Sequence, residues 1–123
     1  MMTVATFVAS SPIHGVGLFA TRPIAAGTVA CRWDDRFDLA FSNEEVERMP
    51  PLMRGFLEHY GYQDDREPGF TFCEVDNGRF MNHSPQPNLD QVGDRCVALR
   101  DIAAGEELTC DYRQIHSSWR LAA

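Results

Sequence analysis

The sequence contains no lysine, so its eleven cationic side chains are all arginine. Against 18 acidic residues they leave a formal net charge of −7 at pH 7. This charge repels a phosphate backbone, so we expect no direct nucleic-acid partner. A basic peptide or protein is the natural complement of such a surface.

Long hydrophobic runs are also absent. No uncharged apolar stretch approaches the ~20 residues that a membrane span requires, and residues 1–7 show no basic leader. The four cysteines include no Cys-x-x-Cys pair, so we expect no zinc site and reduced thiols at Cys31, Cys73, Cys96 and Cys110. Together these absences predict a soluble, cytoplasmic protein with no membrane partner.

A chain of 123 residues with 44% hydrophobic and 24% charged residues fits one globular domain spanning residues 1–123. A chain of this length buries roughly two thirds of its unfolded surface, so it can form a core without disulfides or metals. Most of the expected elements are strands. They cover residues 4–9, 18–20, 28–31, 70–75 and 94–99, and a glycine-containing turn at 11–17 joins the first two.

Residues 43–62 have a helical pattern. Ser42 can cap the amino end, with Glu45 three residues later, and apolar residues then recur at spacings of three and four. The Pro50-Pro51 pair interrupts this run, so we expect two short helices or one kinked helix.

One phrase occurs twice, as RPIAAG at residues 22–27 and RDIAAG at residues 100–105. Two copies do not make a repeat protein. We expect each copy to form a single helical turn that ends at its glycine and leads into a strand.

Three further segments attract attention: GVG at residues 15–17, RFMNHSPQPN at residues 79–88 and GEELTCDY at residues 105–112. Taken singly, each has a purely structural explanation. A G-x-G sequence most often makes a tight bend, Asn-His-Ser beside proline makes a turn, and the last segment can be an edge strand.

In this order and spacing, the three segments resemble the SET domain family of S-adenosylmethionine-dependent protein lysine methyltransferases, from about residue 14 to residue 112. The resemblance implies a mainly β fold with short helices. Several small curved β-sheets would surround a knot-like crossing near the carboxyl end, with residues 43–62 as a helical insert. Residues 113–123 would form a tail without the zinc-binding cysteines of many relatives.

The resemblance also implies residue roles. The backbone of a glycine-containing turn would approach the methionine part of S-adenosylmethionine. Asn82 would bind the cofactor through its amide and backbone. His83 would border the adenine, and Arg79 would line the same pocket. Tyr112 would lie next to the transferred methyl group as the catalytic tyrosine. The turn consists of His14, Gly15, Val16 and Gly17.

Cys110 lies two residues before Tyr112, so on a strand both would face the substrate channel. Many relatives carry an aromatic residue at this position. The small cysteine favours a channel with room for dimethyl or trimethyl product, but an aromatic residue from elsewhere could fill the same space. Candidates for that residue are Phe72, Tyr60 and Tyr62, and both alternatives remain open.

The resemblance thus implies methyl transfer to lysine side chains of a basic protein, such as a histone, a histone-like protein or a ribosomal protein. A catalytically weak module that binds the cofactor or a basic peptide is the alternative. Small members can dimerise, so a homodimer is a further hypothesis. For Trp119 we consider three roles: a cover over the cofactor or channel, an interface residue, or a core anchor.

Overall fold

The computed structural model describes residues 1–119. Within them, short strands dominate and the helices are brief, as predicted. The strands are β1 (Thr6–Ser10), β2 (Val16–Ala20), β3 (Val29–Arg32), β4 (Asp38–Ser42), β5 (Phe70–Glu74), β6 (Asn82–His83), β7 (Leu89–Val92), β8 (Arg95–Ala98) and β9 (Glu107–Cys110). The helices are α1 (Asn43–Glu47) and α2 (Pro51–Tyr60), with the 3₁₀ helices η1 (Asn77–Phe80) and η2 (Tyr112–Gln114).

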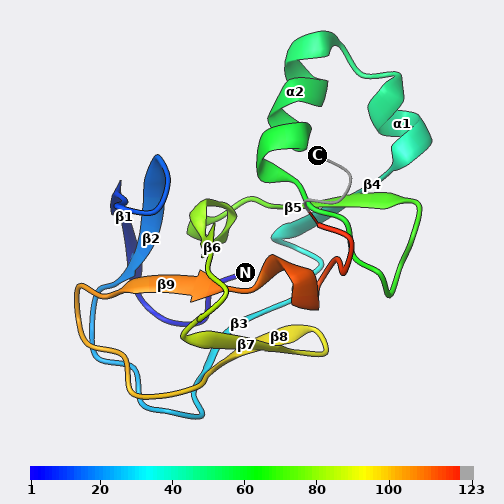
Figure 1. The fold of residues 1–123 in the computed structure, drawn as a ribbon. Coiled ribbons are helices and arrows are strands. Elements are labelled where there is room, and N and C mark those ends of the chain that lie inside the picture. The colour runs from blue at the N-terminus through cyan, green and yellow to red at the C-terminus, as the bar shows by residue number, and fades with distance from the viewer. Residues whose placement is uncertain (120–123) are drawn as a thin grey trace.

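The described strands form three small sheets, with the orders β1-β2-β9-β6, β3-β8-β7 and β4-β5 (Figure 1). All strand pairs are antiparallel except β6 and β9, which run parallel. The β6–β9 pair places the Asn-His segment directly beside the GEELTC strand. Two motifs that are distant in sequence are therefore neighbours in space.

The repeated RPIAAG and RDIAAG segments form turns, so the predicted helical turns are wrong. Thr28 N–H donates to the Ala25 carbonyl and Glu106 N–H to the Ala103 carbonyl, each at 3.1 Å. Gly27 and Gly105 occupy the third position of these two turns, with φ of 84° and 82°. This conformation favours glycine, as at the third position of a type II turn. The two copies also pair with each other, through reciprocal hydrogen bonds of 2.8 Å between Ile24 and Ile102.

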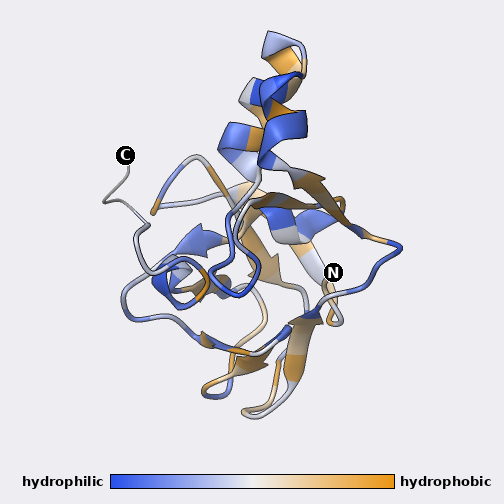
Figure 2. Cartoon of the chain, turned by 90° about the vertical axis from the view of Figure 1, so that its right-hand side faces the viewer, coloured by the Kyte–Doolittle hydropathy of each residue, from blue (hydrophilic) through white to orange (hydrophobic). Residues whose placement is uncertain are grey.

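The helical prediction for residues 43–62 is confirmed as two short helices. The Ser42 hydroxyl accepts the Glu45 N–H at 3.1 Å and caps α1, while Pro51 begins α2, where its missing N–H costs nothing. The helical pair projects beyond the β4–β5 sheet (Figure 1), and both hydrophilic and hydrophobic stretches lie along it (Figure 2). Strands β4, β6 and β7 were not predicted.

The core lies between the sheets and is built from Leu18, Leu89, Ile102 and Leu108, whose exposure is at most 1%. Each such side chain contributes about 1.5–3 kcal/mol by leaving water. Leu18 and Leu108 face each other across β2 and β9. This packing fixes β9, and with it the position of the residues that follow.

The prediction of four reduced cysteines is wrong for one pair. Cys31 in β3 and Cys96 in β8 form a disulfide, with Cα atoms 5.0 Å apart. The spacing of cysteines along the chain does not reveal this pair, because antiparallel pairing of β3 and β8 brings the two residues opposite each other. Cys73 and Cys110 are free and buried. No helix in the described part of the chain is long and apolar enough to cross a membrane.

Candidate active site

Asn82 holds the glycine-containing turn in place. Its side-chain amide nitrogen lies 3.1 Å from the carbonyl oxygens of both His14 and Val16 and 3.0 Å from Glu107 Oε2. Because the amide is engaged within the protein, its role in the structure is to shape the turn. The predicted contact of Asn82 with the cofactor stays a prediction.

The two glycines of the turn differ in their surroundings. A Cβ on Gly17 would overlap the Glu107 carboxylate, so Gly17 allows β2 to pack closely on β9. Gly15 has a φ of 48°, and no heavy atom lies within 4 Å of the place where its Cβ would be. The backbone at Gly15 is therefore accessible to a ligand. Glu107 itself was not identified from the sequence, although it belongs to the GEELTCDY motif.

The His83 side chain points to the opposite side of β6 from that of Asn82 and fixes Tyr112 in place. Its Nδ1 accepts the Tyr112 backbone N–H at 3.1 Å, and the two rings are 5.3 Å apart. Asp111 Oδ1 is 3.6 Å from the same nitrogen. Adjacent residues of one short strand thus connect the turn with Tyr112.

Tyr112 does not continue β9, which ends at Cys110; it begins η2 instead. The prediction that both side chains share one strand face is wrong in that detail, because the Asp111 carboxylate accepts the Arg113 N–H and caps a 3₁₀ turn. The Tyr112 hydroxyl donates to the Met81 carbonyl. Burial raises the pKa of Tyr112 above its usual value, and electrostatic interactions with the Cys110 and Glu74 side chains add to the shift, so the phenol stays protonated.

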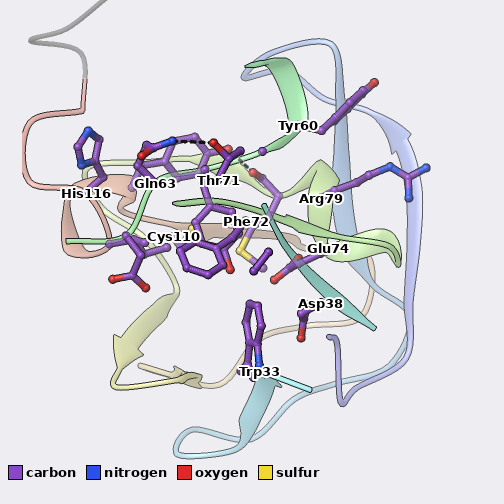
Figure 3. Close-up of a pocket in the computed structure, with 18 of the residues that line it drawn as sticks. Trp33, Asp38, Tyr60, Gln63, Thr71, Phe72, Glu74, Arg79, Cys110 and His116 are labelled. Carbon is purple, nitrogen blue, oxygen red and sulfur yellow. Dashed lines mark hydrogen bonds between the residues drawn. The ribbon is translucent and has the colours of Figure 1, made fainter. Parts of the chain in front are cut away.

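A cavity of about 760 Å³ brings together half of the predicted site residues (Figure 3). Such a volume suits a small-molecule or side-chain site. Its lining includes all four predicted channel residues together with Arg79 and Tyr112; the four are Tyr60, Tyr62, Phe72 and Cys110. The remaining predicted site residues do not line this cavity; they are the turn His14–Gly17, Asn82 and His83.

The inner wall of the cavity is aromatic. The Phe72 ring centre lies 5.7 Å from that of Tyr62 and 5.5 Å from that of Trp33. Trp33 was not identified from the sequence, because nothing along the chain indicates that residues after β3 reach β5. Burial raises the pKa of the Cys110 thiol to about 12, so this thiol is neutral and does not act as a nucleophile.

Tyr60 and Arg79 lie at the edge of the cavity, and Figure 3 shows both side chains extending away from the space beside Cys110. The Arg79 guanidinium carbon lies 4.5 Å from the Phe80 ring centre, and Nη1 donates to the Val75 carbonyl at 3.1 Å. Arg79 Nε is buried and has no hydrogen-bond partner within the described residues. The side chain therefore retains capacity for an anionic ligand.

Two carboxylates form the opposite wall. Asp38 and Glu74 face each other across β4 and β5, and both line the cavity. The Met1 ammonium group is 3.2 Å from Asp38 and 3.9 Å from Glu74. Burial raises the pKa of Glu74 to about 7; Asp38 and Asp76 add to the shift, whereas the Met1 ammonium opposes it.

Trp119 closes one side of this site. Its ring centre lies 4.4 Å from that of His83 and 4.8 Å from that of Tyr112, and the residue lines the cavity. The segment before it is anchored through Asp65, which pairs with His116 Nδ1 at 3.0 Å and accepts the Ser117 N–H at 2.9 Å. These bonds lower the pKa of Asp65 to about 2.

Residues 1–119 contain no group of three or more histidine, cysteine, aspartate or glutamate side chains that could hold a metal ion. The arrangement is a neutral phenol and a neutral thiol in an aromatic cavity, and Asn82 and His83 connect the phenol residue with a turn whose backbone is accessible. A sequence model of the SET domain matches residues 15–113. The chain belongs to the SET domain family.

Two curated relatives show what this SET domain is similar to. It is 30% identical to the histone-lysine N-methyltransferase trithorax of Drosophila virilis, over 84% of this chain and 3% of the relative. It is 33% identical to the H3 lysine-4 specific histone-lysine N-methyltransferase of Saccharomyces cerevisiae, over 85% of this chain and 10% of the relative. The chain thus spans a small part of both relatives.

The fold is also that of solved SET structures. A humanized mutant of the Chaetomium thermophilum Polycomb Repressive Complex 2 superimposes with a TM-score of 0.65 at 21% identity. The match covers 92% of this chain and 15% of that one.

Proposed function

We propose that this SET domain transfers methyl groups from S-adenosylmethionine to lysine side chains of a basic protein. The observation that carries the proposal is the aromatic cavity in which Tyr112 lies beside Cys110, Phe72 and Tyr62. A lysine side chain fits such a channel, because its methylene groups can pack on the rings while its amine reaches the phenol.

The residues present fit the cofactor. Gly15 leaves its backbone accessible, and Arg79 keeps an unpaired Nε that suits the carboxylate of the amino-acid part of S-adenosylmethionine. When bound, the cofactor would supply an electrophilic methyl group on a positively charged sulfur. His14–Gly17, Asn82 and His83 would form the end of the site nearest the cofactor, with Asn82 acting by holding the turn.

The cavity also favours the reactive form of the substrate. A free lysine has a pKa near 10.4, and its ammonium form cannot attack a methyl carbon. Burial among Phe72, Tyr62 and Cys110 disfavours that charged form. Tyr112, fixed by its bonds to Met81 and His83, places its oxygen for weak C–H···O contacts that align the methyl group.

Two aspects of the substrate follow from the same residues. The net charge of −7 favours a basic, lysine-containing protein, and histones, histone-like proteins and ribosomal proteins all meet that need. The small Cys110 side chain favours more than one methyl group per lysine, whereas the Phe72 and Tyr62 rings in the same cavity wall restrict the space.

A cytoplasmic location and a homodimer stay predictions of the sequence. The Cys31–Cys96 disulfide removes part of the argument for a reducing compartment. Trp119 packs on His83 and Tyr112, which favours a cover over the site among its three considered roles.

Calorimetry with S-adenosylmethionine and a tritiated-methyl assay test the proposal together. We expect binding of the cofactor and transfer to at least one protein among core histones, a bacterial histone-like protein and ribosomal proteins. Tyr112→Phe should retain cofactor binding but lose on the order of 10²-fold in rate, because the Met81 bond that positions the ring is gone. Cofactor binding without transfer to any of these proteins would instead support the binding-module alternative.

A further inference from the structure

Glu74 is placed at the end of β5 with its side chain directed into the cavity. The side chain is 20% exposed, and Figure 3 shows it beside Asp38, facing the space that Trp33 and Phe72 border. Gly78 makes room for it, since a Cβ there would overlap Glu74 Oε2. The structure thus accommodates a carboxylate in an otherwise aromatic wall.

This carboxylate has unused hydrogen-bonding capacity. No donor within residues 1–119 hydrogen-bonds it, and its ion pair with the Met1 ammonium is long, at 3.9 Å. Asp38 differs, because it accepts the Met1 ammonium at 3.2 Å and the Asp34 N–H at 2.6 Å. Of the two facing carboxylates, Glu74 is the one available to an incoming donor.

Glu74 also interacts with the reactive end of the cavity. Its charge raises the pKa values of Cys110 and Tyr112, the residues on either side of Asp111. The titratable and charged groups that interact electrostatically with Glu74 come from several elements; they are Met1, Asp38, Tyr62, Cys73, Asp76, Cys110 and Tyr112.

We propose that Glu74 is the proton acceptor that converts the target lysine from ammonium to amine. The inference rests on the proposed function and adds a residue to it. One N–H bond of the ammonium group breaks, its electron pair stays on nitrogen, and the proton forms an O–H bond on Glu74. The neutral nitrogen then attacks the methyl carbon, and the electron pair of the breaking C–S bond goes to sulfur, which becomes an uncharged thioether.

The energetic match supports this role. A general base works best when its pKa lies near the operating pH. Burial raises the pKa of Glu74 to about 7. A lysine ammonium entering the same cavity is destabilised by desolvation. Proton transfer replaces two buried charges with two neutral groups, which the aromatic wall tolerates better.

A binding experiment tests Glu74 without relying on turnover. The probe is Nα-acetyl-lysine-N-methylamide, with the norleucine analogue as its apolar counterpart, titrated at pH 8 into protein labelled with ¹³C at glutamate carboxyl groups. We expect the lysine probe to shift the Glu74 signal and to bind at least tenfold tighter than the norleucine probe. Glu74→Gln should abolish that preference, and the exposed Glu45→Gln should keep it. Equal binding of both probes to wild type would overturn the proposal.

A rate experiment then tests proton transfer. With a protein substrate that wild type methylates, the single-turnover rate should rise with pH through an apparent pKa near 7. Glu74→Gln should be at least 10²-fold slower, should lose that pH step and should keep its calorimetric affinity for S-adenosylmethionine. An unchanged pH profile in Glu74→Gln would refute the role of Glu74 and leave the proposed function standing. Absence of cofactor binding in wild type would refute the proposed function, while the probe titration would still decide on Glu74.

Discussion

At the scale of single residues, neighbouring side chains of β6 divide two tasks. Asn82 points to the turn and binds the His14 and Val16 carbonyls, while His83 points to Tyr112 and accepts its N–H. This follows from the alternation of side chains along a strand. An Asn-His pair is therefore suited to connect the glycine-containing turn with Tyr112.

Replacement of Asn82 by alanine should loosen the turn. It leaves the His14 and Val16 carbonyls without their donor, so we expect a loss of about 1–3 kcal/mol in the free energy of unfolding and weaker binding of S-adenosylmethionine. Urea denaturation and calorimetry measure the two effects. Asn77→Ala is the matched control, because the Asn77 amide makes only a 3.5 Å contact with Thr6 Oγ1. Equal effects of both variants would disprove the assigned role of Asn82.

Replacement of Cys110 by phenylalanine should restrict the product. Cys110 is 6% exposed and lines the cavity beside Tyr112, so a larger ring there removes the space that added methyl groups require. We expect mass spectrometry to show dimethyl or trimethyl lysine with wild type and monomethyl lysine with Cys110→Phe. Strictly monomethyl product from the wild type would mean that Phe72 or Tyr62 already fills this space.

At the scale of elements, the β3–β8 pair is joined covalently as well as by hydrogen bonds. The Cys31–Cys96 disulfide closes a loop with a sequence separation of 65 residues. That loop contains the helical pair and β4–β7. The disulfide thus constrains the segment from which most of the cavity wall is built.

Reduction of this disulfide should lower stability. In the chain-entropy description, a loop of this length contributes about 4 kcal/mol to the free energy of unfolding. Thermal unfolding with and without dithiothreitol should show a lower Tm after reduction. A double variant, Cys31→Ser with Cys96→Ser, should match the reduced protein and show no response to the reductant. A Tm that does not change on reduction of the wild type would contradict the expected stabilisation by the disulfide.

How far the sequence predicted these elements depends on the type of contact. The Ser42 cap and the apolar spacing after it are local, and they correctly predicted the helices. The Cys31–Cys96 disulfide and the Asp38–Glu74 pairing depend on strand register, which no local pattern encodes. The family motifs predicted cavity residues such as Tyr112, but Trp33 and Glu74 reach the cavity only through the folding of β3 to β5.

At the scale of the whole molecule, stability should depend on pH through Glu74. Its pKa is raised from 4.5 to about 7 in the folded chain, so between these values the folded state binds more protons than the unfolded state. The free energy of unfolding should therefore fall as pH rises through that window, by on the order of 2–3 kcal/mol.

The variant Glu74→Gln tests this dependence. Because its side chain does not ionise, it should be more stable than wild type at pH 7.5, and the difference should diminish below pH 4.5. Urea denaturation across this range measures it, and Glu45→Gln should follow the wild-type curve. A Glu74→Gln curve parallel to that of wild type would exclude a raised pKa at Glu74.

The transfer of a methyl group to lysine is tested most directly by mass spectrometry with methyl-deuterated S-adenosylmethionine. Core histones, a histone-like protein and ribosomal proteins are incubated with the purified chain and digested. The account predicts trideuteromethyl groups on lysine side chains with wild type and strongly reduced labelling with Tyr112→Phe. Labelling confined to another residue type, or equal labelling with both proteins, would contradict it.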